Sequence, residues 1–389
     1  MINFNMSKSA LRDLPIFLEK TCLMPNNKCS KIKQIFVTFY ITILLFFGFA
    51  SLPYSGLRKS LEGPAFLNMI GVITISHQFF FYCNQDQIKV WLNTLQAFQK
   101  RHVRKWEKVI FKNESKMIWN LMYYYSNILI AYLVFYQILP FVIDTLVGII
   151  FPKFPSVRVP IFAQGLIDLT KPRTLINISL SILSIMWCCL EILCHIGGQA
   201  FKLVSIAYLR VELKIIKEKI LIIKNMLNKK SKIVAEKLLK DVILHHQAIL
   251  EGLDTMKSTL GFPVALENTT ISVCLCLNLY GIIVLEGKEN IAAKLEGFSG
   301  MLVLLVLFWS CSLGESLEDE NSNIFQSLYD LPWYSEDIQM RKTLIMMLRQ
   351  TNKPFVINYH QRTDLNLCTF MQIINASYSY FTVLRSTTS

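Results

Sequence analysis

Long apolar stretches alternate with shorter polar, lysine-rich segments along the whole 389-residue chain. Seven of the apolar stretches are long enough to cross about 30 Å of hydrocarbon, which takes roughly 20 helical residues. They are residues 34–53, 61–82, 118–151, 175–206, 262–285, 298–317 and 365–384. The third and fourth exceed one bilayer thickness, so we expect these helices to tilt or to project beyond the membrane. The pattern predicts an all-α membrane protein with seven transmembrane helices.

Composition supports this class. Hydrophobic residues make up 53% of the chain and charged residues only 17%, whereas soluble domains carry about a quarter charged residues. A net charge of +13 could also indicate a protein that binds nucleic acid. However, no RNA- or DNA-binding motif is present, and the basic residues lie between the apolar stretches. We therefore expect a membrane partner, lipid, and no nucleic-acid partner.

The distribution of lysine and arginine predicts the orientation. Of the 40 Lys and Arg residues, 31 lie in alternate segments: the N-terminal tail and the second, fourth and sixth loops. Positive segments remain on the cytoplasmic side, so the sequence predicts a cytoplasmic N-terminus and an extracellular C-terminus. This orientation is the reverse of that of a G-protein-coupled receptor.

Two polar segments between the apolar stretches are themselves helical in pattern. Leu and Ile recur at helical spacing among Lys and Glu over residues 210–256, which predicts an extension of the fourth helix, a turn near 228–232 and a helix leading into the fifth. Residues 335–349 predict a shorter amphipathic helix. The resulting organisation is a cytoplasmic tail (1–33), six membrane helices (34–317) with cytoplasmic extensions at about 202–261, a cytoplasmic helical anchor region (318–363) and a last membrane helix (364–389).

Signatures of catalysis are missing from the sequence. It contains no phosphate-binding glycine loop, no nucleophile elbow and no cluster of metal ligands, so neither an enzyme nor a cofactor is predicted. The His245-His246 pair has no companions at metal-ligand spacing, and we interpret it as two side chains on a cytoplasmic helix. We interpret the ionisable residues inside the apolar stretches as scattered and without basic partners: Asp144, Glu191, Glu267, His77 and His195.

A series of short motifs follows the sixth apolar stretch. It comprises Gly314-Glu315-Ser316, the acidic run Glu318–Glu320, Tyr329, Trp333-Tyr334, Lys353-Pro354 and the run Ser377-Tyr378-Ser379-Tyr380-Phe381-Thr382-Val383-Leu384-Arg385. In order and spacing over about 75 residues, the series resembles the C-terminal third of the insect odorant receptors. The first 260 residues resemble that family only in topology and length. The ending typical of the related gustatory receptors, Thr-Tyr and a later Gln-Phe, is absent.

The resemblance implies a function. Members of this family form ligand-gated, non-selective cation channels of four subunits around a central pore, in the plasma membrane of olfactory sensory neurons. An odorant-specific subunit is paired there with a shared olfactory co-receptor. The second cytoplasmic loop lacks the long insertion of co-receptors, so the resemblance implies the odorant-tuning subunit. A homomeric channel like the gustatory receptors, or a membrane transporter, are the alternatives that stay open.

The last apolar stretch carries a polar stripe. Small or polar side chains recur at steps of three and four: Thr369, Gln372, Ala376, Ser379, Val383 and Ser386. The resemblance implies that this helix lines the pore, with Val383 as a hydrophobic gate that opens and closes by dewetting and Ser386 just outside it. The alternative is that the small residues only allow close helix packing.

The ligand site follows from the resemblance as well. The family places it in the outer half of the bundle, among the second to sixth membrane helices, and a volatile molecule needs an apolar pocket with a few polar groups. The residues expected there are Ile70, Ile73, Tyr132, Tyr136, Gln137, Leu139, Ser179, Ile182, Asn278, Tyr280 and Met301. Tyr136 and Tyr280 are the first candidates, because a phenol offers both a ring and a polar tip.

Overall fold

The computed structural model describes residues 10–25, 28–61, 64–102, 104–150, 175–229, 231–285, 291–359 and 363–388. In chain order the elements are α1 (Ala10–Lys20), α2 (Lys28–Leu61), α3 (Pro64–Cys83), α4 (Gln85–Arg101), α5 (Lys105–Leu133), the π-helix η1 (Val134–Ile138), α6 (Leu139–Ile150), α7 (Leu175–Asn228), α8 (Lys232–Leu285), α9 (Ile291–Tyr329), the 3₁₀ turn η2 (Trp333–Ser335), α10 (Ile338–Thr351), β1 (Asn358–Tyr359), β2 (Thr363–Asp364) and α11 (Leu367–Thr388). The all-α prediction is confirmed, since the two-residue strands β1 and β2 are the sole strands in this described part.

Each of the seven predicted apolar stretches coincides with helix wherever the chain is described, except that the last one begins with two non-helical residues, Leu365 and Asn366. By length and composition, four described segments satisfy the requirements of a membrane span: Ser30–Ala50, Ile178–Asn228, Lys232–Ile283 and Gly300–Ser335. Met69–Cys83 is a shorter apolar helix. The last stretch forms α11, whose hydroxyl and amide side chains lower its hydropathy.

The third stretch is not a uniform helix. A π-helical segment, η1, separates α5 from α6, and Pro140 is the second residue of α6. Proline lacks the N–H that would bond one turn back, and its ring crowds that carbonyl. A π-helical turn is a common way to accommodate such a break.

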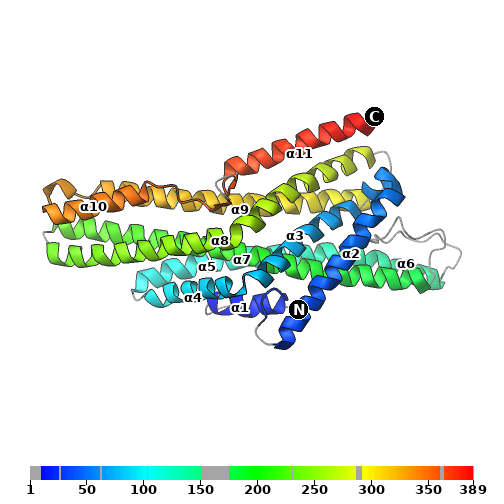
Figure 1. The fold of residues 1–389 in the computed structure, drawn as a ribbon, viewed down its shortest axis with the longest axis horizontal. Coiled ribbons are helices and arrows are strands. Elements are labelled where there is room, and N and C mark those ends of the chain that lie inside the picture. Colours follow the sequence, from blue (N-terminus) through cyan, green and yellow to red (C-terminus); the bar gives the residue numbers. More distant parts are fainter. Residues whose placement is uncertain are drawn as a thin grey trace.

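The long axis of the molecule is built by α7, α8 and α9, which lie side by side in Figure 1. Helices α7 and α8 have 54 residues each, or about 80 Å at 1.5 Å per residue. Because this far exceeds the hydrocarbon thickness, both project beyond the membrane, as the sequence predicts. The predicted turn is confirmed too, with α7 ending at Asn228 and α8 beginning at Lys232.

Helix α10 packs against α9 at one end of the bundle, where the extensions of α7 and α8 also lie; we call this the α10 end (Figure 1). The predicted amphipathic helix at 335–349 begins later, at Ile338, because Trp333–Ser335 form a 3₁₀ turn instead. Its apolar face is buried through Met340, Leu344 and Met347. The apolar face of α10 is therefore covered by helices of the same protomer.

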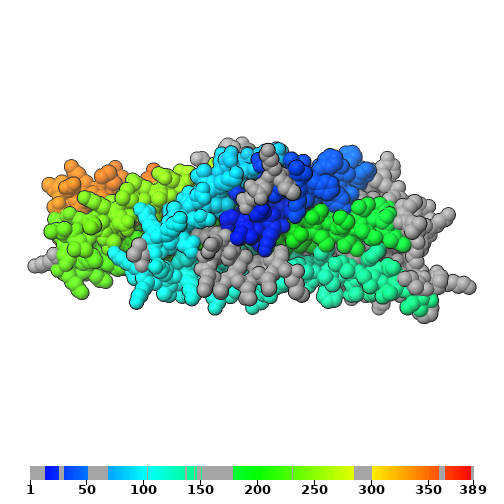
Figure 2. Space-filling view, turned by 90° about the horizontal axis from the view of Figure 1, so that it is seen from below, coloured from blue at the N-terminus to red at the C-terminus, as the bar shows by residue number. Residues whose placement is uncertain are grey.

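The N-terminal segment is packed onto the bundle. Leu14, Phe17 and Leu18 on α1 are buried, and α1 contacts α4, α5 and α7. Figure 2 shows the dark blue part of the chain, which includes α1, near the middle of the face in view, between cyan and green parts. The stretch predicted as a tail thus includes a docked helix.

The junction between α9 and α11 explains the Gly314-Glu315 motif. A Cβ at Gly314 would lie 1.8 Å from the backbone oxygen of Leu365, so only glycine permits this crossing. Glu315 accepts a hydrogen bond from the Leu367 amide at 3.2 Å, at the first turn of α11. The Asn366 side chain accepts another from the Thr369 amide at 3.0 Å, which is the geometry of an N-cap. These contacts fix the point at which α11 begins, against α9 (Figure 1).

Candidate ligand-binding cavity

A cavity of about 60 Å³ lies among five helices, α3, α5, α7, α8 and α9. A water molecule needs about 10–15 Å³ of such space, so the cavity can hold a small organic molecule. Its lining is Ile70, Ile73, Tyr125, Leu129, Tyr132, Leu133, Cys188, Glu191, Ile192, His195, Glu267, Ile271, Leu302, Val303 and Val306. Aliphatic side chains dominate, and a few ionisable groups interrupt them. This combination is typical of ligand pockets.

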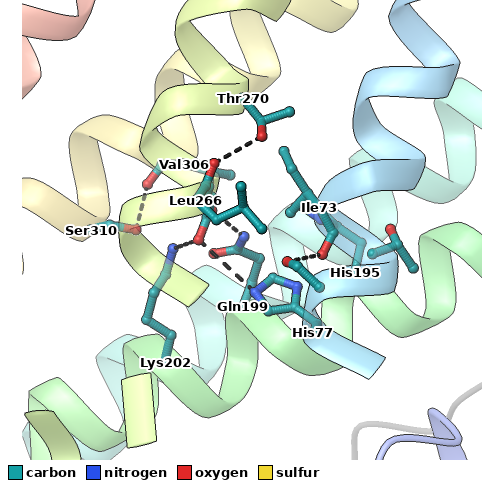
Figure 3. Close-up of polar contacts among 12 residues, drawn as sticks. Ile73, His77, His195, Gln199, Lys202, Leu266, Thr270, Val306 and Ser310 are labelled. Atoms are coloured by element: carbon teal, nitrogen blue, oxygen red, sulfur yellow. Dashed lines mark hydrogen bonds and ion pairs between the residues drawn. The ribbon is translucent and has the colours of Figure 1, made fainter. Parts of the chain in front are cut away.

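Glu267 is the centre of a buried polar network at the cavity wall. Its carboxylate accepts hydrogen bonds from Lys202 Nζ at 2.8 Å and from Gln199 Nε2 at 2.6 Å. The Nε2 atom of His77 lies 4.0 Å from the same carboxylate. Figure 3 shows the three side chains converging from α7 and α3. The buried charge of Glu267 is therefore paired and hydrogen-bonded, which offsets part of the cost of its desolvation.

His77 reaches this network because α7 carries glycine beneath it. A Cβ at Gly198 would lie 2.7 Å from His77 Nδ1. His195, one turn earlier on α7, makes a 2.9 Å hydrogen bond through Nε2 with the Tyr125 hydroxyl. Both imidazoles are thereby held by neighbours on other helices.

Glu191 behaves differently. It is 2% exposed and lines the cavity, yet within the described part of the chain it makes no hydrogen bond or ion pair. Its Oε1 atom is buried without a partner. A buried carboxylate without a partner is energetically costly, so this residue marks the wall as a candidate binding surface.

The interpretation of the intramembrane charges as scattered is wrong. Glu191, His195 and Glu267 line one cavity, and Lys202 supplies the basic partner. The sequence did carry a signal. Residues 191, 195, 199 and 202 are Glu, His, Gln and Lys at steps of four, four and three, which places them on one helix face. The side chain of Asp144 lies outside the described residues.

Of the predicted ligand residues, Ile70, Ile73 and Tyr132 line the cavity. The structure places four others on the outer surface of the chain: Leu139, Ser179, Ile182 and Met301. A membrane helix presents apolar side chains to lipid as well as to the interior, so apolarity alone does not identify the inward face. The side chains of Tyr136 and Gln137 lie outside the described residues.

Asn278 and Tyr280 are buried but lie away from the cavity. Asn278 donates a hydrogen bond to the Cys274 carbonyl at 3.1 Å, one turn back on α8. Tyr280 packs in a separate small cluster with Cys276 and with Phe381 of α11. Asn278 also faces α9, where a Cβ at Gly300 would lie 2.9 Å from its side chain, and neither residue belongs to the cavity lining.

Helix α11 has two distinct faces. Thr369, Ile373, Ser377 and Phe381 recur every four residues and are buried against the bundle. Gln372, Ser379, Val383 and Ser386 are exposed, with Val383 63% exposed, and Ala376 is half-buried. The predicted stripe therefore faces away from the bundle except at Thr369, where the helix begins against α9.

A second buried cluster occupies the α10 end. Glu212 is fully buried, and its two carboxylate oxygens each lie 2.9 Å from a histidine Nε2, one from His102 and one from His245. Burial alone would raise the pKa of Glu212, but the hydrogen bonds from the two histidines outweigh it and lower the pKa. Sequence reasoning missed this cluster, because its members come from three separate segments of the chain. Among the described residues no group of His, Cys, Asp or Glu is arranged to hold a metal ion.

Comparisons with known proteins agree with this geometry. A family model described as 7tm Odorant receptor matches residues 65–378. Odorant receptor 10 of Aedes albopictus is 25% identical over 245 residues, which are 61% of this chain and 62% of that receptor. Odorant receptor 67a of Drosophila melanogaster is 26% identical over 153 residues, 38% of this chain and 36% of that receptor. The aligned region thus spans less than two thirds of these relatives.

Solved structures extend the similarity to nearly the whole chain. The insect olfactory receptor OR5 from Machilis hrabei superposes with a TM-score of 0.78 at 15% identity, covering 96% of this chain and 97% of that one. Its complex with eugenol superposes with a TM-score of 0.77 at 14% identity, covering 97% of both chains. This similarity establishes the fold, which is a seven-helix membrane fold, as the sequence predicts.

Proposed function

The chain belongs to the 7tm odorant receptor family, and on this premise we propose that it is the odorant-binding subunit of a ligand-gated, non-selective cation channel. The channel is a heteromeric tetramer in the plasma membrane of olfactory sensory neurons, and the partner is the shared olfactory co-receptor. The N-terminus and the α10 end are cytoplasmic in this proposal, in agreement with the excess of lysine and arginine there.

The cavity is the observation that carries the proposal. It is enclosed by five helices, and aliphatic side chains with a few polar groups form its wall. This lining suits a small volatile molecule whose hydrocarbon part is buried. We assign Ile70, Ile73 and Tyr132 as ligand contacts. The eugenol complex of a protein with the same fold supports a small organic ligand.

A path from the cavity to the pore is available through packing. Glu267 and Ile271 of α8 and Val306 of α9 line the cavity, and α11 packs on both α8 and α9. Tyr280 extends this contact by packing against Phe381. We therefore assign Tyr280 to coupling between the bundle and α11. A ligand that favours one packing of these helices then shifts the equilibrium of the gate.

The pore is assigned to the exposed face of α11. Gln372, Ala376, Ser379 and Ser386 supply a wettable lining, and Val383 supplies one apolar ring that opens and closes by dewetting. Replacing Val383 with serine is expected to raise the resting current several-fold, whereas Tyr378→Ser, on another face of the helix, leaves it unchanged. An unchanged leak in Val383→Ser would remove this residue from the gate.

The deciding experiment is whole-cell recording from cells that express the chain with and without an insect co-receptor, exposed to a panel of volatile esters, alcohols, aldehydes and amines. We expect an odorant-evoked cation current only with the co-receptor and without G-protein signalling. Current from the chain alone would favour a homomeric channel like the gustatory receptors. Silence in both conditions, with the protein at the cell surface, would contradict the proposed function.

A further inference from the structure

Glu191 is the one carboxylate of the cavity lining that the described structure leaves uncompensated. The other carboxylate, Glu267, receives hydrogen bonds from Lys202 and Gln199. Lys202 is thereby committed to Glu267, and the Nε2 of His195 is committed to Tyr125. The Nδ1 atom of His195, one turn along α7 from Glu191, is buried without a hydrogen-bond partner, and the described structure contains no hydrogen bond or ion pair between these two side chains.

The surroundings of Glu191 are apolar. Ile70 and Ile73 line the cavity from α3, Ile192 follows Glu191 on α7, and Leu302 and Val306 line it from α9. Glu191 itself is 2% exposed, and its Oε1 atom has no hydrogen-bond partner. The cavity thus presents an aliphatic wall together with one acidic group, Glu191, that has no compensating partner, and a molecule that fills it must match both.

We propose that this cavity binds small amines, with the nitrogen at Glu191 and the hydrocarbon part against the aliphatic wall. This inference rests on the proposed function, because it names the chemical class of the odorant. An ammonium ion at the carboxylate forms a charge-assisted hydrogen bond. It also gives the buried carboxyl group of Glu191 the hydrogen-bond partner that its Oε1 atom lacks in the described structure.

The charge balance favours an amine over a fixed cation. An amine can reach the cavity as the neutral base, and a protonated Glu191 can transfer its proton to the nitrogen. Ammonium and carboxylate then form together, and no net charge enters the apolar interior. A quaternary ammonium ion has no such route.

An alcohol of the same skeleton is the informative competitor. It fills the same apolar space and can donate one hydrogen bond to Glu191, but it supplies no charge. An apolar pocket distinguishes molecules of the same shape poorly. The preference of amine over alcohol therefore reports on Glu191 and not on the fit of the hydrocarbon.

The test compares matched pairs, 3-methylbutylamine with 3-methylbutanol and 2-phenylethylamine with 2-phenylethanol, on the receptor co-expressed with its co-receptor. We expect the half-maximal concentration of the preferred amine to be at least tenfold lower than that of its alcohol. Glu191→Gln keeps the shape and abolishes this preference, with the alcohol response retained. Glu191→Asp keeps the charge and retains a reduced preference. Equal potency of amine and alcohol in the unmodified receptor, or a preference that persists in Glu191→Gln, would overturn the inference.

A second readout separates this inference from the proposed function. The purified complex is heated with and without the amine, and the unfolding temperature is measured for the unmodified protein and for Glu191→Gln. We expect the amine to raise the unfolding temperature only of the unmodified protein. Amine stabilisation without current would contradict the channel function but keep amine binding. Currents with neutral odorants alone, without amine stabilisation, would overturn amine binding and keep the channel function.

Discussion

Two buried glutamates on the same helix, α7, have opposite environments. Glu212 at the α10 end has a histidine Nε2 on each of its oxygens, and both contacts are 2.9 Å long. Glu191, in the cavity wall, has no hydrogen-bond partner in the described structure at its buried Oε1. A fully satisfied buried charge holds helices together, whereas an unsatisfied one leaves binding energy available for a ligand. On this contrast, Glu212 is a structural residue and Glu191 is a ligand-binding residue of the same helix.

Glu267 is an intermediate case. It lines the cavity like Glu191, yet it is satisfied by Lys202 and Gln199 like Glu212. Its network ties α7 to α8, and His77 adds α3 (Figure 3). We therefore assign Glu267 to the shape of the cavity wall and Glu191 to the ligand.

The comparison is tested most strongly by removing each carboxylate. Glu212→Leu leaves two buried Nε2–H donors without an acceptor and is expected to lower the free energy of unfolding by about 3 kcal/mol. Glu191→Leu removes a carboxylate that no group requires and is expected to leave stability unchanged or slightly raised. Unfolding temperatures of the purified complexes in detergent measure both. Equal destabilisation by the two variants would contradict the distinction.

A pH titration sharpens the description of the α10 end. His246 is buried, and burial lowers its pKa from 6.5 to about 4. The unfolded chain takes up a proton below about pH 6.5 and the folded protein only below about pH 4, so stability is full above this window and falls as the pH decreases through it. At about 1.4 kcal/mol per pKa unit, the loss approaches about 3 kcal/mol. The pKa of Glu212 is lowered by the hydrogen bonds from His102 and His245, which outweigh the effect of burial.

The matched variant for this titration is His246→Leu. It is expected to lose less stability than the unmodified protein when the unfolding temperature is followed from pH 7 to pH 4.5. An identical pH dependence in the two proteins would show that the imidazole of His246 does not titrate differently on folding.

The smallest effect is expected at a less buried ion pair of the same end. Glu114 accepts a hydrogen bond from Arg210 at 3.0 Å and is also paired with Lys214, but its side chain is 18% exposed. Because solvent screens such pairs, Glu114→Gln is expected to lower stability by less than about 1 kcal/mol. The same unfolding experiment measures this loss. A loss as large as that of Glu212→Leu would mean that the burial of a carboxylate does not determine how much its contacts contribute to stability.

Much of the fold could be predicted from the sequence, because it follows from local pattern. Apolar length located the membrane helices, and the helical spacing of Leu and Ile over residues 210–256 located the turn between α7 and α8. Within the motif series, Gly314 and Glu315 are explained by the crossing and cap at the start of α11. The helices and the turn depend on residues that are neighbours along the chain, and the crossing depends on one close approach, between Gly314 and the backbone of Leu365.

The cavity was predicted less well, because it depends on which face of each helix turns inward. Ile70, Ile73 and Tyr132 line it, whereas Ile182 and Met301 lie on the outer surface. Apolar residues suit both lipid and interior, so the hydropathy pattern does not distinguish the two. The polar steps at 191, 195, 199 and 202 were the better guide, since ionisable groups in a membrane helix turn away from lipid.

The central claim is that the cavity among α3, α5, α7, α8 and α9 is the site where the ligand acts. The most direct measurement is the odorant dose–response of three receptors co-expressed with the co-receptor: the unmodified chain, Ile73→Trp, which fills the cavity, and Ile182→Trp, which adds the same bulk at a side chain 46% exposed on α7. At equal surface expression, the account predicts that Ile73→Trp loses at least tenfold in sensitivity and that Ile182→Trp responds like the unmodified chain. Unchanged sensitivity in Ile73→Trp would contradict it.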